Sequence, residues 1–166
     1  MYGLVRNLGY FIVKHKNSAH NVDDSVDLFI QSEEIEGVHS IEPYIALRDR
    51  LDSLKKELHS LINVIDSNAN KIVGYGASHS TTTLLHHFEI GDQIEYIVDD
   101  NTIKHNHYSP GYHLPVYSPN KLLDDKIEYV ILLAWQHQDS IIKRNKKFVN
   151  NGVKFIVPLP ELIVID

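Results

Sequence analysis

Apolar and polar residues follow two different patterns along the chain. From about residue 71 onward, short apolar runs alternate with amphipathic stretches, an order typical of a parallel β-sheet with crossover helices. Before residue 71, apolar residues recur at helical spacing after a short strand-like run at Leu8–Val13. The pattern therefore predicts an N-terminal strand and helical arm, residues 1–70, followed by an α/β domain, residues 71–166.

Two helices are expected in the arm. Asp23 or Asp24 can cap the first helix, which runs to about Glu36 and ends at Gly37. Ser40 can cap the second helix.

The second helix carries a narrow apolar stripe. Its members recur alternately three and four residues apart: Tyr44, Leu47, Leu51, Leu54, Leu58, Leu61 and Ile65. Many core helices show this period, which favours packing on the chain's own domain. The alternative is the seam of a coiled-coil dimer.

The second region predicts a Rossmann-like, mostly parallel sheet with flanking helices. Strands are expected at 71–75, 94–98, 114–116, 128–134 and 153–157, the last of them the final strand that the pattern predicts. Helices are expected at 80–88, 118–123 and 138–150. The strand at 128–134 has too few polar residues for a surface strand, so it belongs in the centre of the sheet.

Composition narrows the possible functions. The 166 residues contain no cysteine, which excludes disulfides, a cysteine nucleophile and a thiolate zinc site. A formal charge of −6 disfavours nucleic acid as a partner. No apolar run approaches the roughly 18 residues of a membrane helix, and the N-terminus has no signal-peptide pattern, so a cytoplasmic protein is expected.

The segment GYGASHSTTTLL, after the first predicted strand, is a candidate phosphate loop. Gly74 and Gly76 allow close approach of the backbone, and the following helix N-terminus offers free N–H groups. Polar side chains of the loop add further donors: Ser78, His79, Ser80, Thr81 and Thr82. The G-x-G-x-x-G pattern is incomplete because residue 79 is histidine, so a tight turn without a ligand is the alternative.

Asp99 ends the next predicted strand. Rossmann proteins place a carboxylate at about this interval to bind a ribose hydroxyl. The run Asp99-Asp100-Asn101 also suits a turn or a helix cap. Since a carboxylate repels a second phosphate, it belongs at the sugar or base end of a nucleotide.

Several separated segments together resemble one family. They are YGAS at 75–78, TTLL at 82–85, VDDN at 98–101 with Lys104, SPGYHLPV at 109–116, LLAWQ at 132–136 and KFIVPLPE at 154–161. Their order and spacing are similar to the C-terminal domain of the S-adenosylmethionine-dependent sugar C-methyltransferases, which act on dTDP-linked keto-deoxysugars. The segment Gly9–Val13 is similar to the last strand of that family's methyltransferase domain.

The resemblance implies one part of a three-part enzyme, which also has a zinc domain and a domain that holds S-adenosylmethionine. This chain has neither the cysteines of the first nor the glycine-rich loop and the Tyr-His-Glu-His stretch of the second. We therefore expect it to bind no cofactor alone, with S-adenosylmethionine entering only through a partner or missing domain.

The loop and the resemblance together give a set of candidate substrate-binding residues: Tyr75, Gly76, Ala77, Ser78, His79, Ser80, Asp99, Asp100, Asn101, Lys104 and Trp135. The family loop is close to YGASAKGNTLL, and here Ser80 and Thr81 replace its lysine and second glycine, which weakens the expected pyrophosphate site. Trp135 either stacks on the ligand or belongs to the core. Tyr75 either forms a second stacking platform or packs under the loop.

Histidines supply the remaining candidates. His79 and His137 are weak candidates for acid–base catalysis, the second beside Asp139, which a capping role explains more simply. His105, His107 and His113 form an H-x-H-x5-H cluster that could hold a metal, but loop histidines are commonly solvated and we expect no metal site.

These features favour a domain that binds a nucleotide-linked sugar, and the resemblance implies a dTDP-keto-deoxysugar in deoxysugar or cell-surface polysaccharide biosynthesis. It would act with a separate methyltransferase partner or as a homo-oligomer. The alternative is an isomerase or epimerase on a nucleotide-linked keto-sugar, using His79 or His137. A Rossmann protein of the NAD type is disfavoured by the incomplete glycine pattern and the lack of a second substrate domain.

Overall fold

The computed structural model describes residues 13–19, 21–68 and 70–166. The described residues form two compact units, one ending at Ile45 and the other spanning Ala46–Asp166. Helix α1 (Ser25–Glu36) lies in the first unit, and helix α2 (Glu42–Ser67) begins there and continues into the second. The boundary between these two units falls inside α2.

Both predicted helices of the arm form. α1 ends at Gly37, whose φ of 69° lies in the left-handed region that favours glycine. Ser40 is not the residue directly before α2, because the helix begins two residues later, at Glu42; its hydroxyl donates to the carbonyl of Gly37 at 2.9 Å. The predicted strand at Leu8–Val13 lies outside the described residues, except for Val13.

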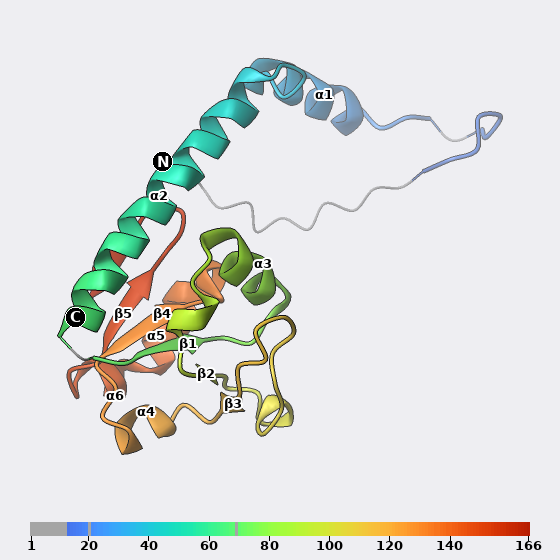
Figure 1. Ribbon diagram of the computed structural model, residues 1–166. Coiled ribbons are helices and arrows are strands. Elements are labelled where there is room, and N and C mark those ends of the chain that lie inside the picture. The colour runs from blue at the N-terminus through green and yellow to red at the C-terminus, as the bar shows by residue number, and fades with distance from the viewer. Residues whose placement is uncertain (1–12, 20, 69) are drawn as a thin grey trace. The chain divides into compact units, whose positions relative to one another are not determined.

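Six strands form one sheet in the second unit, in the order β3-β2-β1-β4-β5-β6 (Figure 1). They are β1 (Ile72–Tyr75), β2 (Ile97–Val98), β3 (Val116–Tyr117), β4 (Tyr129–Leu132), β5 (Lys154–Val157) and β6 (Ile163–Ile165). The first five strands pair in parallel and β6 is antiparallel to β5. This strand order is that of the Rossmann fold, which confirms the predicted α/β class.

The helices of this unit connect the strands. They are α3 (His79–Phe88), α4 (Lys121–Asp124), α5 (Gln138–Arg144) and α6 (Lys146–Val149), with single turns of 3-10 helix at η1 (Gly91–Gln93), η2 (Thr102–Lys104) and η3 (Trp135–His137). None of the described helices is long and apolar enough to cross a membrane.

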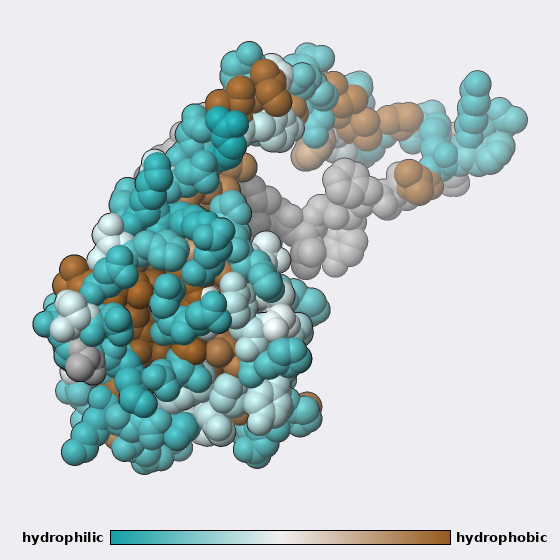
Figure 2. Space-filling view, in the orientation of Figure 1, coloured by the Kyte–Doolittle hydropathy of each residue, from teal (hydrophilic) through white to brown (hydrophobic). Residues whose placement is uncertain are grey.

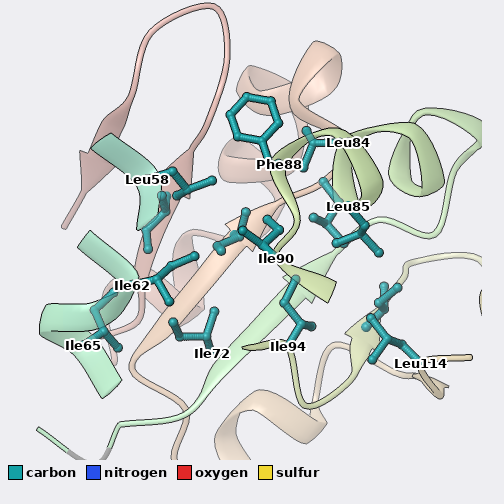
Figure 3. Close-up of a cluster of buried hydrophobic side chains, with 14 of the residues drawn as sticks. Leu58, Ile62, Ile65, Ile72, Leu84, Leu85, Phe88, Ile90, Ile94 and Leu114 are labelled. Carbon is teal, nitrogen blue, oxygen red and sulfur yellow. The ribbon is translucent and has the colours of Figure 1, made fainter. Parts of the chain in front are cut away.

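The two faces of the sheet have separate cores. On one face, Leu58 and Ile62 of α2 pack with Leu85 and Phe88 of α3 against the strands (Figure 3). The opposite core gathers residues of the strands with residues of α4, α5 and α6: Val73, Tyr75, Leu122, Ile141, Phe148 and Phe155. Successive residues of β1 serve the two cores in turn because strand side chains alternate between faces.

The apolar stripe of α2 is divided in two. Leu54, Leu58 and Ile65 are buried, which confirms packing on the chain's own domain for the C-terminal half of the helix. Tyr44 and Leu47 are 53% and 54% exposed. The N-terminal half of the stripe is therefore uncovered within the described chain.

Two predictions need correction. The strand at 153–157 is not the last, because the chain turns after it and Ile163–Ile165 pairs antiparallel with β5. The helix expected at 138–150 is interrupted at Asn145, which is 4% exposed. Its side-chain amide donates to the Tyr75 hydroxyl at 2.7 Å and to the Ile141 carbonyl at 2.9 Å, so a buried polar contact fixes the residue at the break.

A pair of leucine substitutions tests the division of the stripe. Leu58→Ala should lower the free energy of unfolding by about 2–5 kcal/mol, because it removes a fully buried side chain and leaves a cavity. The matched change Leu47→Ala should cost less than about 1 kcal/mol, since Leu47 is half exposed. Urea unfolding followed by circular dichroism measures both, and equal losses would contradict the division.

Candidate functional site

The candidate site lies at the carboxyl edge of the sheet, at the end of β1. Strand β1 has β2 as its neighbour on one side and β4 on the other. In open α/β sheets, ligands bind at such a switch in strand order. The loop after β1, the run Asp99–Asn101 after β2 and η3 after β4 all begin at this edge. The structure thus gathers the candidate residues from three distant parts of the sequence.

Gly76 allows the first loop to pass closely over the end of β4. Its φ is +100°, and a Cβ at this position would lie 2.5 Å from the Cβ of Ala134 and 3.1 Å from its backbone nitrogen. The N–H of Gly76 donates to the carbonyl of Val98 at 2.8 Å. Only glycine fits here, because any side chain would meet both an unfavourable φ and the backbone of a neighbouring strand.

The carboxylate of Asp99 fixes the same loop. It accepts hydrogen bonds from the N–H of Ala77 at 2.7 Å, from the N–H of Asn101 at 2.8 Å and from the Lys104 ammonium at 2.9 Å. The residue is 7% exposed. A ribose hydroxyl would have to share this carboxylate with three donors of the protein, so the predicted ribose contact stays a prediction while the turn-forming role is observed.

Asn101 helps to place Lys104. Its side-chain oxygen accepts from the N–H of Ile103 at 3.0 Å and so caps η2, whose last residue is Lys104. The Lys104 ammonium balances the charge of Asp99 beside the loop. That pairing lowers the repulsion that an unpaired carboxylate would exert on a phosphate.

The first turn of α3 has backbone N–H groups that could bind an anion. The N–H of Ser78 donates to the Thr81 hydroxyl at 2.9 Å, and that hydroxyl donates to the carbonyl of Gly76 at 2.6 Å. Within the described part of the chain, the N–H groups of His79 and Ser80 have no hydrogen-bond acceptor. Two N–H groups and the positive end of the helix dipole therefore face the edge of the sheet.

Tyr75 and Asp100 belong to the opposite side of the sheet, toward α5. Tyr75 is 1% exposed; its hydroxyl donates to Asp100 Oδ1 at 2.6 Å and accepts from Asn145. Burial, and then the hydrogen bond to Asp100, raise the pKa of the Tyr75 hydroxyl, which stays protonated. Arg144 pairs with Asp100 at 3.0 Å. Tyr75 thus packs under the loop, and its ring is not presented to a ligand in this structure.

The residues that follow β4 form the remaining part of the candidate site. Trp135 is partly buried and packs against the cores of both faces, while the neighbouring Gln136 accepts from the Ser80 hydroxyl at 3.4 Å. The structure thus links η3 to the first turn of α3. His79 and His137 are exposed, and neither imidazole has a hydrogen bond to another described side chain. An acid–base role for either stays a prediction.

The histidine cluster of the 105–113 loop is dispersed. The ring of His105 is hydrogen-bonded through Nε2 to the carbonyl of Asp99 at 2.7 Å, and His107 Nδ1 to the carbonyl of His105 at 2.9 Å. His113 is exposed, with φ of 54°. Among the described residues, no group of three or more His, Asp or Glu side chains is placed to hold a metal ion.

A pocket of about 360 Å³ adjoins the loop on the side of β2 and β3. Its walls come from the loop, the first turn of α3 and the segment after β2, and include Ala77, Thr82, Ile103, Lys104, Tyr108 and Pro110. Sequence reasoning identified Thr82 and Lys104 of this lining but missed Ile103 and Tyr108, which belong to none of the motifs. Tyr108 lies in the loop before Leu114-Pro115-Val116. An aromatic residue in that loop is the feature of the sequence that could have indicated the pocket.

Comparison with known proteins gives three findings. A family model described as the C-methyltransferase C-terminal domain matches residues 7–160. The C-methyltransferase NovU of Streptomyces niveus is 30% identical over 148 residues, which cover 89% of this chain and 35% of that protein, so the chain spans about a third of this relative. The crystal structure of UDP-D-quinovosamine 4-dehydrogenase from Vibrio fischeri aligns with a TM-score of 0.41 and 18% identity, over 58% of this chain and 93% of that one.

Two neighbouring carboxylates provide a test of the loop geometry. Asp99→Asn should lower the free energy of unfolding by about 1–3 kcal/mol, because its amide group must face a buried N–H donor. The control Asp100→Asn keeps an oxygen for the Tyr75 hydroxyl and should cost less than about 1 kcal/mol. Urea unfolding gives both values, and amide exchange at Ala77 should accelerate in Asp99→Asn alone. Equal losses and unchanged exchange would show that Asp99 does not fix the loop.

Proposed function

The chain belongs to the C-methyltransferase C-terminal domain family, and on that basis we propose that it binds a nucleotide-linked sugar for methyl transfer by a partner domain. The observation that carries the proposal is the pair of N–H groups of His79 and Ser80 at the switch in strand order. A phosphate group suits such a helix N-terminus. The dTDP-keto-deoxysugars expected from the family carry a diphosphate between nucleoside and sugar.

The chain's own residues would bind and orient this ligand rather than transform it. The first turn of α3 would hold a phosphate, and Lys104 would offset the charge of Asp99 close by. Trp135 and Gln136 lie on the other side of the loop, where a sugar would extend. S-adenosylmethionine would be supplied by the partner, in deoxysugar or cell-surface polysaccharide biosynthesis. Among the described residues, no contact of His79 or His137 favours the alternative of an isomerase or epimerase.

The first unit supports the idea of a partner. No residue of α1 is buried, although the helix carries Val26 and Ile30 on one side and Leu28 and Ile35 on the opposite side. Figure 2 shows several apolar residues at the surface of this helix. Ile35 is 87% exposed and Leu28 is 66% exposed. A helix with apolar residues on opposite sides is normally enclosed, so we propose that this one packs against the methyltransferase domain or another copy of the chain.

Ligand titration tests the binding role. Calorimetry and thermal-shift measurements should show that dTDP and dTDP-glucose stabilise the chain, because a ligand that binds only the folded state raises the melting temperature. S-adenosylmethionine should have no effect. His79→Pro should weaken dTDP binding about tenfold or more, because it removes one N–H donor to a charged group. Proline is tolerated at the first helical position, and the extended backbone of Ser78 suits a following proline.

The control is His79→Ala, which removes the imidazole and keeps the N–H. It should bind dTDP within about threefold of wild type, unless a protonated imidazole contributes more than the backbone. Equal weakening in both variants would assign the contact to the imidazole. Failure of every nucleotide to stabilise the wild-type chain would contradict the proposed function.

A further inference from the structure

The pocket beside α3 has a chemical character that differs from that of the loop. It lies over β2 and β3, between the first turn of α3 and the segment 103–110. Three lining polar groups have a partner within the protein: the Thr81 hydroxyl donates to Gly76, the Ser109 hydroxyl accepts from Leu114 and the Lys104 ammonium donates to Asp99. Apolar atoms, among them those of Ala77, Ile103 and Pro110, make up most of the remaining wall.

Two large side chains are exposed at this pocket. Tyr108 is 68% exposed and Ile103 is 80% exposed, and both line it. An aromatic ring at the surface beside an apolar hollow offers a stacking platform, and every nucleobase has a flat face that can use it. The pocket thus suits a flat, weakly polar ring better than a phosphate or a sugar.

His107 adds a polar group that suits a base edge. Its Nδ1 lies 2.9 Å from the carbonyl oxygen of His105, and because a carbonyl only accepts, Nδ1 must be the donor. In the neutral ring Nε2 is then an acceptor. His107 lines the pocket, so an N–H group of a base can find an acceptor there.

We infer that the nucleobase of the ligand occupies this pocket and stacks on Tyr108. The inference rests on the proposed function, since the phosphate position sets the direction of the ligand. Ser78 and Thr81 line the pocket, and Ser80 of the same turn is hydrogen-bonded to Gln136 on the other side. The base therefore lies over β2 and β3, the phosphates lie at the start of α3, and the sugar extends over β4 toward Trp135.

This orientation gives the two ends of the ligand separate contacts. Changes at Tyr108 affect recognition of the nucleoside, which dTDP and dTDP-glucose share. Changes at Trp135 affect only the sugar, which dTDP lacks. The reverse orientation, with the base over β4, exchanges these two effects.

The test is calorimetry of four chains, wild type, Tyr108→Ala, Tyr108→Phe and Trp135→Ala, with dTDP and dTDP-glucose. Tyr108→Ala should weaken both ligands equally, by about tenfold, because it removes the stacking surface. Tyr108→Phe keeps that surface and should bind like wild type. Trp135→Ala should leave dTDP binding unchanged and weaken dTDP-glucose alone. UDP, ADP and GDP, titrated with wild type, identify which class of base the pocket accepts.

The outcomes separate this inference from the proposal on which it rests. If wild type binds dTDP and Tyr108→Ala binds it equally well, the base does not lie in this pocket and the inference is overturned. If Trp135→Ala weakens dTDP itself, the orientation is reversed. If no nucleotide binds wild type, the proposed function fails, and the inference falls with it. Circular dichroism of each variant confirms that the fold is retained.

Discussion

The carboxylate of Asp99 is the contact on which the shape of the candidate site depends. It joins the end of β2 to the backbone of the loop after β1 and to the Lys104 ammonium. Because it takes up the N–H of Ala77, the donors left for an anion are those of His79 and Ser80, at the start of α3. The site therefore differs from a glycine-rich loop in which successive N–H groups surround a diphosphate.

The position of β1 at the centre of the sheet imposes a second constraint. Its side chains must pack into the cores on both faces, and the candidate loop must begin at its end. Its alternating residues enter the two cores, and Gly76 lets the chain leave the strand against the end of β4. Asp99 and Asp100 follow the same alternation: one fixes the loop and the other accepts the buried Tyr75 hydroxyl. Two adjacent carboxylates thus stabilise opposite sides of the sheet edge, which explains why the turn needs more than one acid.

The two units contribute differently to the proposed function. The second unit has a core on each face of its sheet and a formed pocket, and the proposed ligand binding rests on these features. The first unit buries none of its α1 residues and presents apolar side chains on opposite sides of that helix. Such a helix is poorly stable alone, because short helices in water depend on packing. A division between ligand binding in one unit and contact with a partner in the other accounts for both observations.

The sequence by itself determined the fold class, the strand-to-helix loop and the family, because these depend on local periodicity and on spacing along the chain. It also assigned Asp99 and Trp135 to the ends of two strands, and the carboxyl ends of parallel strands share an edge. The tertiary structure alone decided how those groups are used: Asp99 bonds to Ala77, Tyr75 lies in the core, and Asn145 interrupts a helix to reach it. It likewise added β6 and the pocket at Tyr108. Hydrogen bonds and packing between residues distant in sequence leave no periodic signal, so these features appear only once the chain is folded.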